Sequence, residues 1–340
     1  MNHARFLTSL LLSILLMGCG SAEPQGPTIV RGDDATATVG GETPPEPDPV
    51  PTGPAPSFMG ANHTVVMRLD MTRVRASAIS DDIAGLVRSY PTWQELLGNS
   101  GIEPVRDFER VLVSAPGGMA GESVMVLRHN MTEARVREAV LSMAVEGAAP
   151  PAWRQEDGFD VVDWPAQTEV PRVVVISAEH ELIVATPGEL ARILEVAADH
   201  RLRRGANADA IIEPQLQLPT GTIVTVSATE VSSSVASRLP HPPQAFALEV
   251  TDDQAEEGRM QLDAQADYAD AAAAEAARSW VAGQRDQYAG HMMVRAVGLD
   301  RVLREAEIGA EGTQVQLGAS FTEEELQRVI GLLALLQIGG

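Results

Sequence analysis

The pattern over residues 259–267 constrains the fold more than any other feature of this sequence. Polar and apolar residues alternate there without a break: Arg259, Gln261, Asp263, Gln265 and Asp267 share one face, and Met260, Leu262, Ala264 and Ala266 share the other. Successive side chains of a β-strand point to opposite faces of its sheet. The alternation therefore predicts a strand with one face against a core and one face in water, as is typical of antiparallel sheets.

Strand and helix patterns interleave along the rest of residues 58–340. The strand patterns lie at 63–70, 109–116, 122–129, 159–164, 172–178, 181–186, 221–228, 244–252, 258–268 and 313–320. The helical patterns lie at 80–89, 132–145, 187–198, 230–239, 269–287 and 299–305, with a last helix opened by Ser320 as its cap. Consecutive hairpins predict an α+β fold in which antiparallel sheets carry helices packed on one face.

The order of these elements repeats. Residues 58–200 and residues 201–340 each give a strand, a helix, a hairpin, a further helix, strand and closing helix, with the second set shortened. We therefore expect two α+β units that are divergent copies of one unit. In such a duplication the hairpins 109–129 and 243–267 would match each other.

The region before the folded part has a different composition. Residues 20–57 contain nine prolines and neither an aromatic residue nor a leucine. Such a segment cannot bury enough apolar surface to offset the entropy of ordering, so residues 19–57 are predicted to form a disordered linker. At about 3.1 Å per residue, a fully extended polyproline-like chain of this length would reach about 120 Å.

The single cysteine of the chain, Cys19, ends an apolar run near the N-terminus. Arg5 precedes the run, which covers Leu7–Met17 and is broken only by Thr8, Ser9 and Ser13. The run is shorter than the roughly 17–25 apolar residues that a membrane-spanning helix needs. A basic start, a short apolar stretch and a small residue before the cut are typical of an export signal, predicted here over residues 1–18.

The segment Leu16-Met17-Gly18-Cys19 resembles the lipobox of bacterial lipoproteins. The resemblance implies that the Cys19 sulfur carries a diacylglyceryl group, that the signal is removed before Cys19, and that the new amine is acylated. It also implies an outer-membrane location in a Gram-negative cell, because Gly20 and not an aspartate follows the cysteine. The alternative is an ordinary secretory signal with an incidental cysteine, but an exported thiol without a disulfide partner would be unusual.

Charge excludes several classes of function. The sequence has 25 basic and 47 acidic residues, a formal net charge of −22, and all of its basic residues are arginines. Such a surface repels nucleic acid, so no nucleic-acid partner is predicted. Without lysine the chain has no Schiff-base amine, no Ser-Lys dyad and no phosphate-binding loop ending in Gly-Lys.

The sequence predicts no catalytic residue, cofactor or metal site. None of the seven histidines lies three or four residues from another, and no Gly-x-Ser-x-Gly motif occurs. His180 is expected at a turn between strands. Four acidic residues, Asp252, Asp253, Glu256 and Glu257, are expected to form a solvated hairpin tip, with weak Ca²⁺ binding as the alternative.

Two further segments invite a functional interpretation. Arg201, Arg203 and Arg204 follow the helix pattern 187–198, where they could bind an anion but are expected to offset the negative end of that helix. The apolar residues 329–339 span only about half of a bilayer core as a helix, so they predict a core helix and not a membrane anchor.

Together these features favour a membrane-tethered envelope lipoprotein whose folded part is a non-catalytic binding or structural module. The expected partners are the membrane, through the lipidated N-terminus, and an envelope protein or cell-wall polymer. The alternative is a hydrolase, such as a glycosidase, whose carboxylates converge only in the fold. A deep pocket with two convergent carboxylates would favour the enzyme, and a shallow groove would favour the binding module.

Overall fold

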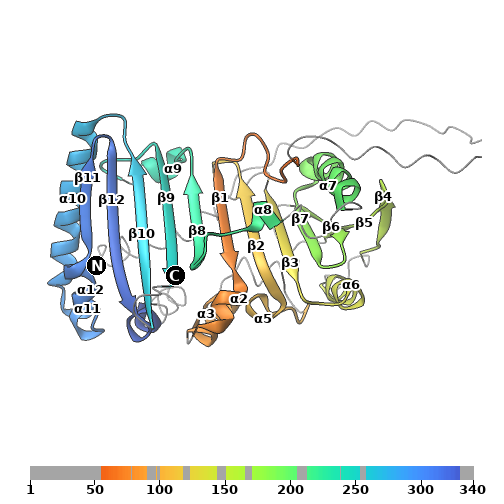
Figure 1. Ribbon diagram of the computed structural model, residues 1–340, viewed down its shortest axis with the longest axis horizontal. Coiled ribbons are helices and arrows are strands. Elements are labelled where there is room, and N and C mark those ends of the chain that lie inside the picture. The colour runs from red at the N-terminus through yellow and green to blue at the C-terminus, as the bar shows by residue number, and fades with distance from the viewer. Residues whose placement is uncertain are drawn as a thin grey trace, which may run out of the picture.

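One antiparallel sheet runs through the computed structural model, with its strands standing side by side from one end to the other (Figure 1). The structure describes residues 55–77, 79–89, 97, 100–117, 123–143, 151–164, 171–204, 213–237, 239–252 and 258–329. Cys19 and most of the expected linker lie outside these residues, as do residues 253–257 of the acidic hairpin tip and residues 330–340. The strand order of the 12-stranded sheet is β11-β12-β10-β9-β8-β1-β2-β3-β7-β6-β5-β4.

The first half of the chain supplies seven of these strands. They are β1 (Val65–Asp70), β2 (Phe108–Ala115), β3 (Val124–His129), β4 (Arg154–Glu156), β5 (Phe159–Trp164), β6 (Arg172–Ala178) and β7 (Glu181–Ala185). Its helices are α2 (Met71–Ala76), α3 (Ser80–Ser89), α5 (Pro104–Asp107), α6 (Glu133–Ser142), the 3-10 turn η1 (Pro187–Glu189), α7 (Leu190–Arg204) and α8 (Glu213–Leu216).

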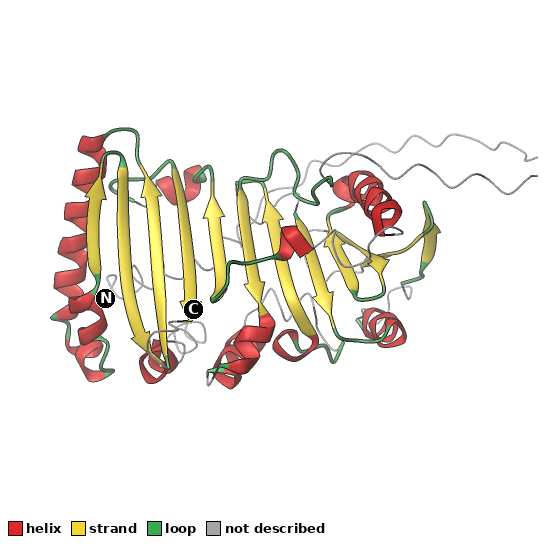
Figure 2. Cartoon of the chain, in the orientation of Figure 1, coloured by secondary structure: helices red, strands yellow, loops and turns green. Residues whose placement is uncertain are grey.

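The second half supplies five strands and a long helix at the sheet edge. The strands are β8 (Thr222–Ala228), β9 (Ala245–Asp252), β10 (Arg259–Asp267), β11 (Glu307–Glu311) and β12 (Gln314–Thr322). The helices are α9 (Ser233–Ala236), α10 (Ala271–Ala289), α11 (Met292–Ala296) and α12 (Asp300–Glu305). Figure 2 shows α10 running beside β11, with which it is in contact.

The two halves meet at the centre of the sheet. β1 pairs antiparallel with β8, joining Val65–Leu69 to Val224–Ala228, and on its other side β1 pairs with β2. Strands from the beginning and the middle of the chain therefore form one continuous hydrogen-bonded ladder. The α+β class and the antiparallel sheet predicted from the sequence are confirmed.

The expectation that helices pack on one face is wrong for the first half. Val111 and Val113 of β2 share a core with α2, α5 and α6, whereas Leu112 of the same strand shares a second core with α7 and α8. The physical reason lies in the strands, because all five residues of β7 and most residues of β2 and β6 are buried. A sheet that is apolar on both faces needs cover on both faces.

In the second half, cover is found on the face that continues the α6 side. Ala274 and Ala277 of α10 pack against Val315 of β12, and Val302 of α12 packs against Ala319. The last described helix begins at residue 323. Its Leu326 packs on the same core as Met260.

The hairpins 109–129 and 243–267 occupy corresponding places in the strand order. β2 and β3 follow outward from β1, and β9 and β10 follow outward from β8. The halves differ elsewhere: α7 covers one face after β7, while the helix after β12 packs on the opposite face. Duplication of one unit therefore stays a prediction.

Helix ends were predicted less well than strands. α3 has the expected bounds, but α7 continues to Arg204, past the expected boundary at residue 200 between the units. The helix expected over 230–239 is reduced to α9, because Ser232 to Ser234 favour competing local hydrogen bonds. The last helix is capped not by Ser320, which lies in β12, but by Thr322, whose hydroxyl accepts from the Glu325 N–H at 3.3 Å.

Candidate functional site

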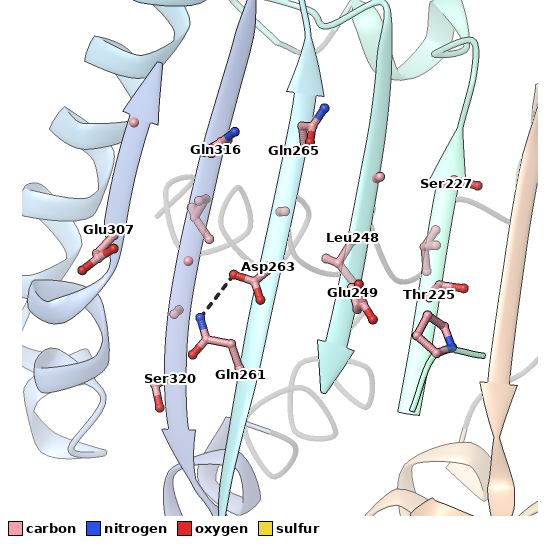
Figure 3. Close-up of a pocket in the computed structure, with 18 of the residues that line it drawn as sticks. Thr225, Ser227, Leu248, Glu249, Gln261, Asp263, Gln265, Glu307, Gln316 and Ser320 are labelled. Carbon is pink, nitrogen blue, oxygen red and sulfur yellow. Dashed lines mark hydrogen bonds between the residues drawn. The ribbon is translucent and has the colours of Figure 1, made fainter. Parts of the chain in front are cut away.

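A trough of about 990 Å³ lies in the second half, on the face of the sheet opposite α10 and α12 (Figure 3). Its floor is formed by neighbouring strands β8, β9, β10 and β12, and the polar side chains of these strands point into it. The polar floor residues are Thr225, Ser227, Glu249, Gln261, Asp263, Gln265, Gln316 and Ser320. The trough is open to solvent along the sheet and is not a deep pocket.

The side walls come from elements at either end of this strand group. Arg68 of β1 and the segment containing Gln217 and Pro219 border it on one side. Glu305 at the end of α12 and Glu307 of β11 border it on the other. The described lining residues include no aromatic side chain.

The alternation of each strand explains why the floor is polar. In β10, Gln261, Asp263 and Gln265 face the trough while Met260 is buried on the other side, as the pattern over 259–267 predicted. Gln316 and Ser320 repeat this arrangement in β12. In the first half, α7 and α8 cover this same face, whereas in the second half α10 and α12 pack on the opposite face.

Two carboxylates lie side by side on the floor. Asp263 of β10 is the direct cross-strand partner of Glu249 of β9, and both lie on the trough face. The Asp263 Oδ1 accepts a hydrogen bond from the Gln261 amide at 3.2 Å, and the Glu249 carboxylate accepts one from the Thr222 hydroxyl. Like charges placed directly opposite each other repel, so the sequence retains an unfavourable pair here.

Arg68 is the cation at the other end of the floor. Its Nε donates to the backbone oxygen of Gln215 at 2.8 Å, and its Nη2 lies 3.9 Å from the sulfur of Met59. Burial lowers the pKa of the Arg68 guanidinium. Among the described residues it forms no ion pair, so its charge is offset only by neutral acceptors.

A serine, a histidine and a glutamate meet elsewhere, but they are buried. The Ser114 hydroxyl lies within hydrogen-bonding distance of His63 Nδ1, and His63 Nε2 lies 3.7 Å from Glu189 Oε1. The Ser114 residue is 1% exposed and Glu189 is held by Arg192. A nucleophile must reach its substrate, so this group links β2 and the residues before β1 to η1 and does not form a hydrolytic centre.

Near α7, three side chains that we call the clamp bind the first described residues of the chain. Arg192, His200 and Gln215 bind the backbone of residues 56–58: the Arg192 Nη2 donates to the Phe58 oxygen at 2.8 Å, and the Gln215 amide donates to the Pro56 oxygen at 3.0 Å. His200 Nε2 lies 2.8 Å from the Pro56 oxygen. Phe58 is fully buried, its ring edge-on to His200 at 4.9 Å. The segment that leads from the expected linker is thus fixed to α7 and α8.

The described histidines are not clustered in a group of three or more. His129 and His180 are neighbours, with ring centroids 5.9 Å apart, and His180 is half-exposed in the turn between β6 and β7, as the sequence predicted. No group of three or more His, Cys, Asp or Glu residues in the described part of the chain could hold a metal ion.

The arginines after residue 200 have structural partners. Arg201 donates to the backbone oxygen of Gly158 at 2.9 Å and lies over the Phe159 ring at 3.6 Å, and Arg203 pairs with Asp199. Both lie inside α7 and not after it, which corrects the expected position of the helix end.

Sequence reasoning found one strand of the trough and missed the others. The polar face of residues 259–267 was identified, and the shorter alternations in β8 and β12 carry the same signal. Nothing in the sequence could place Arg68 or Glu249 beside them, because the ladder β1-β8-β9-β10 joins residues up to about two hundred positions apart. Cys19 lies outside the described residues.

Comparisons with known proteins add little. No family model and no curated protein matches the sequence. A crystal structure of TP0453, in crystal form I, is similar with a TM-score of 0.43 and 12% identity, covering 81% of this chain and 96% of that chain. None of the described helices combines the length and the apolar character needed to span a membrane.

Proposed function

We propose that this protein is a lipid-anchored bacterial envelope protein whose folded part binds a partner without catalysis, through the trough. The open polar trough is the observation that carries this proposal. A long floor of amides, hydroxyls and carboxylates offers many hydrogen bonds to an extended ligand. The Cys19 segment and the proline-rich linker would hold this surface near a membrane, in a Gram-negative cell the outer membrane.

A hydrolase is the second candidate, because Glu249 and Asp263 are adjacent. Paired-carboxylate glycosidases place their two carboxyl groups on either side of the scissile bond, one of them protonated. Here both carboxylates come from neighbouring strands of the floor, on the same side of any ligand. This geometry supports the binding module over the enzyme.

The binding proposal can be tested by photo-crosslinking in living cells. A photoreactive residue placed at Gln316, which is exposed on the floor, should give adducts with an envelope partner. The same residue placed at Glu138, exposed on α6 and outside the trough, should give none. The proposal would be wrong if Gln316 captured nothing while the purified protein hydrolysed a polysaccharide or an ester, and the Asp263→Asn variant lost that activity.

The anchor has a separate test. Cells expressing the full chain should incorporate radioactive fatty acid into it and retain it with the membranes, since two or more acyl chains give stable anchoring. The Cys19→Ala variant should do neither. Equal labelling of the two proteins would rule out lipidation at Cys19.

A further inference from the structure

Arg68 and three of the four carboxylates that line the trough lie in one row across the strands; the fourth, Glu305, belongs to α12. Arg68 of β1 is opposite Thr225 of β8, Thr225 is opposite Glu249 of β9, and Glu249 is opposite Asp263 of β10. All four side chains line the trough. The row continues from Asp263 through Gly318 of β12 to Glu307 of β11, which also lines the trough. It therefore has a cation at one end and three carboxylates further along, at a single level of the sheet.

Strand spacing sets the distance between these charges. Neighbouring strands lie about 4.8 Å apart, so the backbone of Arg68 is about 10 Å from that of Glu249 and about 14 Å from that of Asp263. In the structure the Arg68 guanidinium contacts the Gln215 oxygen and the Met59 sulfur instead of these carboxylates. None of the three forms an ion pair with any residue that the structure describes.

The hydrogen bonds to these groups leave capacity for a ligand. A carboxylate has about four acceptor positions, and one described bond reaches each of Glu249 and Asp263. A guanidinium has five N–H donors, and the described contacts of Arg68 are a backbone oxygen and a thioether. An ammonium group between the carboxylates would also relieve their mutual repulsion.

The floor matches a peptide better than a neutral sugar polymer. The trough has no aromatic side chain among its described lining residues on which a flat, apolar ligand face could pack. Its amides and hydroxyls can donate to and accept from a backbone. An uncharged polymer would leave both ends of the charged row without a counter-charge.

We propose that the trough binds an extended peptidic ligand that lies across the strands, with an amine over Glu249 and Asp263 and a carboxylate at Arg68. An extended chain advances about 3.3–3.6 Å per residue, so a separation of 10–14 Å corresponds to three or four residues. This inference rests on the proposed binding function and names the chemical class of its ligand.

The test uses the purified full chain and three peptides of one length. Tetraglycine has both charges, N-acetyl-tetraglycine lacks the amine, and tetraglycine amide lacks the carboxylate. Binding is measured by ligand-observed NMR titration. We expect each blocked peptide to bind about three- to fivefold more weakly than tetraglycine, the usual value of one exposed ion pair. Added salt should reduce the advantage of tetraglycine.

Variants then assign each end. Asp263→Asn should weaken the preference for the free amine and keep the preference for the free carboxylate, whereas Arg68→Gln should weaken the preference for the free carboxylate and keep that for the amine. Because Arg68 also contacts Gln215, the Arg68→Gln result is interpreted only if the far-UV circular dichroism spectrum of the variant matches that of the natural protein. Glu195→Gln, on the exposed side of α7, is the charge-matched control and should change neither preference.

The outcomes separate this inference from the proposed function. Equal binding of all three peptides, or no binding of any, would overturn the proposal that the ligand carries an amine at one end and a carboxylate at the other. Adducts at Gln316 in cells would still support a binding module in that case. Failure of both experiments would overturn both proposals.

Discussion

Two buried titratable residues, Glu325 and His129, link stability to pH in different ranges. Glu325 accepts hydrogen bonds from Arg301 at 2.8 Å and from the Thr322 N–H at 2.9 Å, and these contacts lower its pKa to about 2. His129 is 2% exposed, and burial together with the neighbouring His180 lowers its pKa to about 4. Both groups therefore favour the deprotonated form in the folded protein.

The charge of Glu325 should stabilise the fold at neutral pH. Its pKa in the unfolded chain is near 4.3, so this stabilisation is complete above that pH and is lost as the pH falls toward about 2. We expect Glu325→Gln to cost on the order of 2 kcal/mol at pH 7, measured by urea denaturation, with a smaller cost at pH 3. Glu324→Gln, on the exposed side of the same helix, should cost little; a cost of Glu325→Gln that does not change with pH would contradict the assignment.

His129 should destabilise the fold in weak acid. The unfolded chain takes up the proton near pH 6.5 and the folded chain only near pH 4, so stability falls between these values. We expect the His129→Gln variant to lose less stability than the natural protein over this range, by on the order of 2 kcal/mol in urea titrations. Parallel curves for His129→Gln and the natural protein would refute this role.

At the scale of elements, the helix caps differ in what their side chains do. Thr132 accepts a hydrogen bond from the Arg135 N–H at 3.3 Å and caps α6. Thr186 occupies the N-cap position of η1, which leads into α7. In the structure its buried hydroxyl has no hydrogen-bond partner among the described residues, and Glu189 pairs with Arg192.

The two threonines should therefore respond oppositely to removal of the hydroxyl. Thr132→Val should cost about 1 kcal/mol, the usual value of a helix N-cap. Thr186→Val keeps the shape and removes a buried unpaired group, so its stability should be unchanged or up to about 1 kcal/mol higher. Thermal denaturation measures both, and an equal loss at both positions would show that Thr186 is a working cap.

Patterns within one element could be predicted from the sequence, whereas contacts between distant elements could not. Alternation in residues such as Gln261 to Gln265 depends on one strand only, so most strands and the polar floor of β10 were predictable. The cover of both sheet faces in the first half depends on which strands become neighbours, as with Val111 and Leu112. The charged row was unpredictable for the same reason, because Arg68 and Asp263 are joined only through β8 and β9.

At the scale of the molecule, the β1–β8 ladder makes the two halves depend on each other. A chain divided between Arg204 and Glu213 would leave β1 and β8 as edge strands, each unpaired on one side. Both strands contain buried apolar residues, such as Val65 in β1 and Val226 in β8. Exposed edges of this kind pair with other chains.

We expect fragments 1–208 and 209–340 to aggregate when they are expressed alone. Expressed together they should form a soluble 1:1 complex, which size-exclusion chromatography with light scattering would detect. Two fragments that are each folded and monomeric would show that the ladder is dispensable and that the halves are independent domains.

The clamp and the trough are in direct contact through one hydrogen bond, from Arg68 of the trough to Gln215 of the clamp. Gln215 holds Pro56 and Phe58 with its side chain and accepts from Arg68 with its backbone, and Arg68 lines the trough. In the anchored protein proposed here, tension from the membrane would enter the folded part at the clamp and act on the arginine at the end of the trough. Coupling between two binding sites is reciprocal. A ligand that moves Arg68 would therefore change the binding free energy of residues 56–58 at the clamp by the same amount as tension on the linker would change the binding free energy of the ligand.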